Sequence, residues 1–151
     1  MGSISGPSGE PQGRDATGPK ISLADARRVL DGSPFAQWWG FTLEGIGEGE
    51  ATMLLPFRAE MLRPGGFLQG GASMALADAA FWLALMTVVG EEPMALTLEM
   101  KTNFLRGARG DLRCRARVLK AGRRIVYGEA STTERDVLVA HHTLTYMRAP
   151  A

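Results

Sequence analysis

Hydrophobic and polar residues alternate with a period of two in several segments of the chain, and this pattern predicts β-strands with one buried face and one polar face. In the first such segment, residues 41–57, Gly47 to Gly49 supply a turn, so a hairpin is expected. Alternation predicts further strands at residues 96–104 and 112–118, and a composition typical of strands, rich in Ile, Val, Tyr and Thr in the first of them, predicts two more at residues 123–134 and 137–147. Because short turns connect them, the pattern predicts an antiparallel sheet of about six strands.

Residues 70–90, GGASMALADAAFWLALMTVVG, form the longest apolar segment and carry a single charge, Asp78. A helix that is apolar on every side is either a membrane span or a core helix covered by protein. The central carboxylate, the small alanines and the amphipathic strands before and after it favour the core helix. We therefore predict an α+β domain in which one long central helix lies on the apolar face of a curved antiparallel sheet.

The first 20 residues contain five glycines, three prolines and few large apolar side chains, so we expect a flexible tail there. Residues 21–151 are expected to form a single domain. Ser22 has the position of an N-cap for a short helix that ends at Gly32. A second short helix is expected from Pro34 to Trp39. We expect its three aromatic side chains to lie against the core: Phe35, Trp38 and Trp39.

A length of 151 residues corresponds to about one domain, and 45% hydrophobic with 22% charged residues is ordinary globular usage. Disorder of the whole chain is thereby excluded. The single cysteine, Cys114, excludes an internal disulfide, and no secretory segment opens the sequence, so we expect a cytoplasmic protein. Cys114 lies on the apolar side of its strand and is expected to be a core residue rather than a nucleophile.

The formal net charge is only +1, which argues against a dedicated nucleic-acid or membrane-surface protein. Positive charge is nevertheless concentrated between Arg106 and Arg124, where eight basic residues stand against one acid. This segment lacks aromatic residues on which bases could stack, which also disfavours nucleic acid as a partner. Two interpretations stay open for it: a surface for a small anionic ligand, or a solvated strand face rich in arginine.

Asp78 is the strongest candidate for chemistry. A carboxylate in the middle of an apolar helix loses solvation, and this placement is typical of a general base or nucleophile whose proton affinity is adjusted to its task. The alternative is a structural aspartate that bonds to a neighbouring backbone group or to a partner subunit.

Gly70 and Gly71 open the same helix. Backbone N–H groups at a helix start have no acceptor within the helix, so they can bind an anion or a developing oxyanion, although a glycine pair can equally mark a tight turn. Gly70 and Asp78 are about 12 Å apart along a continuous helix, at 1.5 Å per residue. If both act on one substrate, a symmetric dimer must place Gly70 of one subunit opposite Asp78 of the other.

Other catalytic patterns are weaker. His141 and His142 are adjacent in an expected strand, so they point to opposite faces and cannot act together on one centre. The sequence contains no GxSxG elbow of serine hydrolases and no GxGxxG or GxxxxGK[ST] phosphate loop.

The segments RPGGFLQGGASMALADAAFW, residues 63–82, and ALTLEMKTNFLR, residues 95–106, resemble the hotdog-fold acyl-CoA thioesterases. The resemblance is strongest to the phenylacetate-degradation (PaaI) type and the related 4-hydroxybenzoyl-CoA thioesterases. That family shows a polar residue, a Gly-Gly pair and an acidic residue nine positions after the polar one. Gln69, Gly70, Gly71 and Asp78 have this spacing, and residues 35–148 have the family's order of elements.

The resemblance implies a homodimeric or tetrameric acyl-CoA thioesterase without a metal or other cofactor, in which coenzyme A is part of the substrate. Asp78 would act as nucleophile or general base, and the Gly70 amide would polarise the thioester carbonyl across the dimer. Thr97 would position water or the carboxylate. The chain departs from the family at Gln69, where His is common, and at Arg63, where Asn is common, and both changes bear on substrate and rate.

The resemblance also implies substrate contacts. Coenzyme A carries phosphates that arginine binds well. The expected substrate-binding residues are Arg63, Gly71, Arg106, Lys120, Arg123 and Arg124, with Phe81 and Trp82 in an acyl pocket. Three other functions are weighed against a thioesterase: a non-catalytic acyl-CoA or lipid-binding hotdog module, a hotdog dehydratase or hydratase, and a basic nucleic-acid binder. The hydratase is disfavoured because its paired Asp and His motif is not found.

Overall fold

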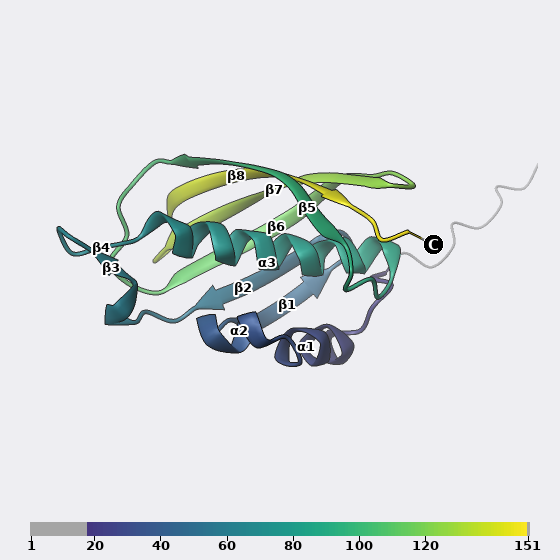
Figure 1. Ribbon diagram of the computed structural model, residues 1–151, viewed down its shortest axis with the longest axis horizontal. Helices are drawn as coiled ribbons and strands as arrows, with labels where there is room; N and C mark the ends of the chain where they lie inside the picture. The colour runs from purple at the N-terminus through teal and green to yellow at the C-terminus, as the bar shows by residue number, and fades with distance from the viewer. Residues whose placement is uncertain (1–17, 151) are drawn as a thin grey trace, which may run out of the picture.

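The fold is seen in a computed structural model that describes residues 18–150 (Figure 1). Its sheet has six antiparallel strands in the order β1-β2-β6-β7-β8-β5. The strands are β1 (Thr42–Gly47), β2 (Glu50–Leu55), β5 (Leu96–Phe104), β6 (Leu112–Ala121), β7 (Ile125–Glu134) and β8 (Val137–Met147). The predicted hairpin and the four predicted later strands are confirmed, and β5 lies at an edge of the sheet.

The long helix α3 (Gly70–Val89) crosses the concave face of the sheet and packs mainly on the central strands β6 and β2 (Figure 1). Its length and apolar composition would suit a membrane span, but 72% of its most apolar stretch is buried inside the protein. The helix is therefore the core helix of the domain. The predicted α+β fold, one long helix on a curved antiparallel sheet, is confirmed.

The close approach of α3 to the sheet depends on Gly128 in β7. A Cβ atom at this position would overlap the carbonyl oxygen of Arg117 on the neighbouring strand and the ring of Phe81 on the helix. Phe81 is fully buried and also packs against Tyr146, with 5.3 Å between the ring centroids. The glycine thus makes the space into which Phe81, the largest fully buried side chain of the central helix, fits.

The N-terminal helices α1 (Leu23–Asp31) and α2 (Pro34–Trp39) lie beside the β1–β2 side of the sheet (Figure 1). Ser22 is the N-cap of α1, as predicted, and accepts a hydrogen bond from the Asp25 amide. Most of the predicted tail, residues 1–20, lies outside the described residues. Within the described part, the Lys20 amide donates to the Thr87 carbonyl (2.7 Å).

The prediction that all aromatic side chains of α2 lie against the core was wrong. Trp38 is 68% exposed and Phe35 is 45% exposed, whereas Trp39 is half-buried and stacks on Phe41. The reason is the position of α2 at the rim of the domain, where only Ala36 is buried completely.

Residues 58–69, between β2 and α3, contain short regular elements although Pro64, Gly65 and Gly66 are typical of a turn. A turn of 3-10 helix, η1 (Ala59–Met61), leads into a short hairpin of β3 (Leu62–Arg63) and β4 (Phe67–Leu68). The Leu68 amide donates to the Ala108 carbonyl (2.8 Å), and the guanidinium of Arg109 lies 4.1 Å from the centre of the Phe67 ring. These contacts fix the hairpin beside the start of α3.

Candidate active site

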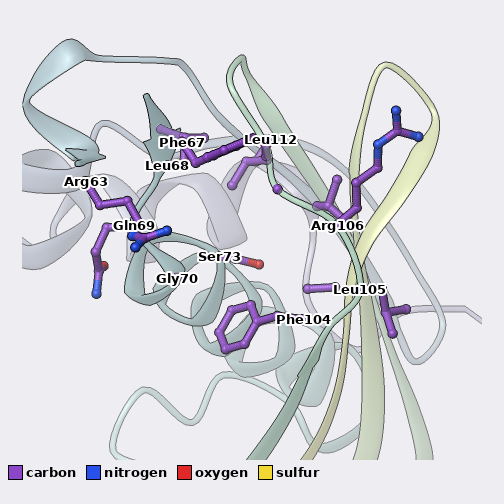
Figure 2. Close-up of a pocket in the computed structure, with 14 residues that line it drawn as sticks. Arg63, Phe67, Leu68, Gln69, Gly70, Ser73, Phe104, Leu105, Arg106 and Leu112 are labelled. Atoms are coloured by element: carbon purple, nitrogen blue, oxygen red, sulfur yellow. The ribbon is translucent and has the colours of Figure 1, made fainter. Parts of the chain in front are cut away.

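A cleft of about 550 Å³ opens at the N-terminal end of α3. Gly70 and Ser73 of the first helical turn lie on one side of it, and the β5–β6 connection lies on the other (Figure 2). Most of the remaining wall is apolar, with two arginines among the lining residues. These other wall residues include Arg63, Phe67, Leu68, Phe104, Leu105, Arg106, Leu112 and Val139.

The backbone at the helix start is open to a ligand. Gln69 occupies the N-cap position but its side chain does not cap the helix, and the N–H groups of Gly70 and Gly71 make no hydrogen bond to any of residues 18–150. The ring of Phe104 packs directly on Gly70, where a Cβ atom would lie 2.9 Å from Cζ of that ring. Glycine is therefore required here for close packing, and its amide remains a free hydrogen-bond donor at the positive end of the helix dipole.

Asp78 lies two turns further along α3, on its half-exposed side. Its Oδ1 atom accepts hydrogen bonds from Thr97 Oγ1 (2.8 Å) and from the Tyr146 hydroxyl (2.7 Å). The carboxylate is neither sealed in the core nor part of the lining of the cleft at Gly70. Within one subunit, the two groups with the strongest predicted roles thus stand apart, as their spacing along the helix requires.

Tyr146 is a site residue that the sequence analysis missed. Burial, together with the adjacent Asp78 carboxylate, raises the pKa of this phenol, so it stays protonated and serves as a hydrogen-bond donor. Its alternation in β8 directs it to the helix side of the sheet, and that alternation was the available signal. Thr97 and Tyr146, which pair across β5 and β8, together hold one carboxylate oxygen from two strands.

The predicted polar residues around the helix start are close together. Figure 2 shows the guanidinium of Arg63 directed toward the first turn of α3, beside Gly70, while Gln69 extends away from it. Gln69 also borders a second cavity of about 450 Å³, whose wall includes Trp38, Trp39 and Met61. The side chain of Gln69 lies so close to Gly71 that a Cβ atom there would be 2.6 Å from Oε1.

The predicted phosphate contacts do not gather in one subunit. Arg106 follows β5 at the end of the sheet near the start of α3, and its side chain extends outward (Figure 2). A second basic group lies in the β6–β7 turn, and it lines a separate groove of about 470 Å³ with Ile125 and Tyr127. The strand register places the β6–β7 turn at the opposite end of the sheet from Arg106. Ile125 pairs with Met147, and Met147 pairs with Leu96 at the start of β5. The second group consists of Lys120, Arg123 and Arg124.

The ion pairs of the β6 arginines favour one of the two interpretations of the basic segment between Arg106 and Arg124, namely a solvated strand face. Arg113 makes a bidentate ion pair with Glu44, Arg115 pairs with Glu50 (2.7 Å), and Arg117 pairs with Glu129 (2.6 Å). Arg113 and Arg117 hold the pKa of their carboxyl partners, Glu44 and Glu129, below the ordinary value. These three arginines therefore form a partly neutralised strand face rather than an anion site.

The two residues expected in an acyl pocket lie in the core. Phe81 is fully buried under the sheet, and Trp82 is 8% exposed with its indole N–H donating to the Pro93 carbonyl (3.2 Å). Cys114 is fully buried, and burial raises the pKa of its thiol to about 12, so it is the inert core residue expected.

The adjacent histidines point to opposite faces, as predicted. The imidazole of His141 contacts Glu129 (3.1 Å) on the outer face, whereas His142 is fully buried between the sheet and α3.

Comparison with known proteins places this architecture in a family. The sequence model of the Thioesterase superfamily matches residues 65–134, which include α3, Asp78 and most of the residues that line the cleft. A protein of Thermoplasma volcanium named "Putative esterase" is 36% identical over 118 residues, covering 78% of this chain and 88% of its own length. The chain belongs to the thioesterase superfamily, and this membership supports a hydrolase.

Solved structures agree with this assignment. A variant of the phenylacetic acid degradation protein PaaI from Thermus thermophilus is 29% identical, with a TM-score of 0.71, covering 78% of this chain and 100% of that chain. A thioesterase of Haemophilus influenzae is 25% identical, with a TM-score of 0.77, covering 87% and 94%. The resemblance of residues 63–106 to hotdog thioesterases is thus confirmed at the level of fold and family.

Proposed function

We propose that the protein is a homodimeric acyl-CoA thioesterase that hydrolyses a thioester to a carboxylic acid and free coenzyme A. The observation that carries this proposal is the pair of groups on α3: a free amide at Gly70 and a carboxylate at Asp78 held by two hydroxyl donors. Because the two lie about 12 Å apart along one helix, each site would combine Asp78 of one subunit with the partner's Gly70.

The edge strand β5 is the surface that best suits the dimer contact. Among residues 18–150 it has a strand neighbour on one side only, and it exposes apolar side chains that an isolated subunit would leave in water. Leu96 is 57% exposed, Leu98 53% and Phe104 56%. The half-exposed positions of α3 near Asp78, such as Met74 and Ala75, belong to the side of the helix that the sheet leaves uncovered.

Antiparallel pairing of two β5 strands would bring the separated groups together. Asp78 lies at the level of Thr97, and Gly70 lies under Phe104. A two-fold axis that passes midway between Thr97 and Phe104, near Met100, would place Thr97 of one strand opposite the partner's Phe104. The partner's Phe104, with the partner's Gly70 beneath it, would then lie beside Thr97 and Asp78. The symmetry operation thus creates two equivalent sites per dimer.

The same operation would combine the basic groups. The Lys120, Arg123 and Arg124 turn lies at the Leu96 end of its own sheet, which is the end that would receive the partner's Arg63 and the partner's Arg106. Coenzyme A carries a pyrophosphate and a 3′-phosphate, so two cationic groups at one end of the site suit its charge. This arrangement supports coenzyme A as the thiol portion of the substrate.

Hydrolysis requires few groups at such a site. The partner's Gly70 N–H donates to the thioester carbonyl oxygen and stabilises the negative charge that develops on it. The Asp78 carboxylate either removes a proton from water as that water attacks the carbonyl carbon, or attacks the carbon itself to give an anhydride that water then cleaves. In both routes the carbon–sulfur bond breaks, water supplies the new oxygen of the acid, and the thiolate takes up a proton.

The decisive experiment compares Asp78→Asn with the wild-type protein in a thiol-release assay on a panel of acyl-CoAs. The substitution keeps the shape of the side chain and removes the base, so turnover should fall at least about a hundredfold. Asp136→Asn is a matched control, because Asp136 is exposed in the β7–β8 turn with φ of 64°, a conformation that Asn also adopts.

Full activity of Asp78→Asn would remove the carboxylate from the mechanism. A wild-type protein that binds a non-hydrolysable acyl-CoA analogue but releases no thiol from any acyl-CoA would instead be a binding module.

A further inference from the structure

A buried polar cluster lies behind the wall of the cleft and has no part in the mechanism above. Its centre is His142 of β8, which is fully buried. Three hydroxyl groups surround the ring: Thr102 Oγ1 lies 2.8 Å from Nδ1, Thr132 Oγ1 lies 2.9 Å from Nε2, and Ser73 Oγ lies 3.5 Å from Nε2. Of these hydroxyl-bearing residues, Ser73 lines the cleft.

We propose that the Ser73 hydroxyl is a second hydrogen-bond donor for the thioester carbonyl oxygen, acting beside the Gly70 amide of the same subunit. This inference rests on the proposed function, because it assigns a role in the same reaction. The Ser73 hydroxyl keeps its hydrogen throughout, so no covalent or proton-transfer step is added.

The hydrogen of the Ser73 hydroxyl is not needed inside the cluster. Burial lowers the pKa of His142 to about 4, so the ring is neutral at neutral pH and has one N–H and one acceptor nitrogen. In either tautomer, the short bonds to Thr102 and Thr132 satisfy both ring nitrogens. The longer Ser73 contact is the weakest of the three. The Ser73 hydroxyl can therefore donate to an acceptor in the cleft without leaving His142 unpaired.

Ser73 also lacks the hydrogen bond that the hydroxyl of a helical serine usually donates to a backbone carbonyl. Such a residue commonly donates to the carbonyl four residues earlier, which here belongs to Gln69. That carbonyl accepts from the Ala72 amide (3.0 Å), and no bond from Ser73 to it is found among residues 18–150. A serine that is 94% buried, borders a ligand-sized cleft and has only one long contact is poised for a ligand.

The position of Ser73 on the helix suits a shared acceptor. Residues three apart in a helix lie on the same face, and Ser73 is about 4.5 Å further along the axis than Gly70. Figure 2 shows both residues in the first turn of α3 at the cleft. A carbonyl oxygen has two lone pairs, so it can accept from an amide and a hydroxyl together. The second donor would strengthen the stabilisation of the developing oxyanion.

The test is the steady-state kinetics of Ser73→Ala on the acyl-CoA that the wild-type protein hydrolyses best. Loss of a donor that acts on the developing charge should lower kcat by about 10- to 100-fold and change KM less than about threefold. The control is Thr87→Ala on the same helix. Thr87 is also fully buried, and its hydroxyl bonds to the Ala84 carbonyl and the Gly49 amide, but it lies far from the cleft. This control should lose stability and keep kcat.

An unchanged kcat in Ser73→Ala, or a loss confined to KM, would overturn the inference and leave the thioesterase proposal intact. If the wild-type protein hydrolyses no acyl-CoA, the proposed function fails, and binding then tests Ser73 separately. The probe is an acyl-CoA analogue in which a methylene group replaces the thioester sulfur and a tetrahedral phosphinate replaces the carbonyl, because its anionic oxygen mimics the charge that develops in the transition state. A roughly tenfold weaker affinity in Ser73→Ala would support the contact, and equal affinities would overturn it.

Discussion

Mild acid should destabilise the protein through His142 well before its carboxylates are protonated. The ring is completely buried, and burial is the main cause that lowers its pKa from the ordinary value of 6.5 to about 4, with a smaller contribution from His141. Between these two pH values the unfolded chain binds a proton that the folded protein excludes. The free energy of unfolding must therefore decrease as the pH falls through this range.

The size of the effect follows from the two pKa values. One pKa unit corresponds to about 1.4 kcal/mol, so the loss approaches about 3 kcal/mol at pH values below 4. At pH 5 the loss is about 2 kcal/mol relative to neutral pH. Glu44 and Glu129 also have lowered pKa values in the folded protein, but their contribution is present above the ordinary value of 4.5 and is lost below it. The interval from pH 6.5 to 5 therefore reports mainly on His142.

The measurement is urea unfolding from pH 7 to pH 5 at one protein concentration, since association would also shift the apparent stability. The wild-type free energy of unfolding should fall by about 2 kcal/mol over this range. His142→Gln cannot take up the proton and should give a nearly flat profile, whereas His141→Gln should keep most of the dependence. Equal slopes for the wild type and His142→Gln would refute the reasoning.

Three further results are expected. Gly128→Ala should lower the free energy of unfolding by about 3 kcal/mol, measured by urea denaturation, because the added methyl group overlaps the Arg117 backbone and the Phe81 ring; a loss below about 1 kcal/mol would contradict this packing. Leu98→Lys should shift the protein toward monomers in sedimentation and reduce thiol release in parallel, whereas Val137→Lys, on a similarly exposed apolar residue outside β5, should do neither; an active Leu98→Lys monomer would exclude the shared site. Tyr146→Phe should lower kcat about tenfold with little change in KM, because Asp78 loses one of its two hydroxyl donors; unchanged kinetics would show that Thr97 suffices.

The sequence alone was sufficient to predict the helices and strands of the fold and the main candidate residues of the site. Alternation at residues 112–118 identified a strand with one buried face, and the strand-like composition of residues 137–147 identified another. The apolar segment around Asp78 identified the central helix. The separation of Gly70 and Asp78 along that helix follows from the rise per residue alone. These features are local, so spacing along the chain determines them.

Features that depend on contacts between distant segments were not predictable. No pattern in the sequence indicates that β5 lies at the edge beside β8, or that the Tyr146 hydroxyl reaches Asp78. The same is true of the glutamates that neutralise the β6 arginines, since Glu44 and Glu50 come from the first hairpin. Trp38 was misjudged for a related reason: its hydrophobicity does not reveal that α2 lies at the rim of the domain.

The place of β5 in the sheet also constrains how the chain can fold during synthesis. Leu96 pairs with Met147, about 50 residues later, so within the part of the chain that the structure describes β5 has no strand neighbour until β8 has been made. Contacts between such distant residues form slowly, and an unpaired apolar strand is prone to aggregation in the meantime. A nascent chain that stalls before Val137 should therefore be a favoured target of chaperones.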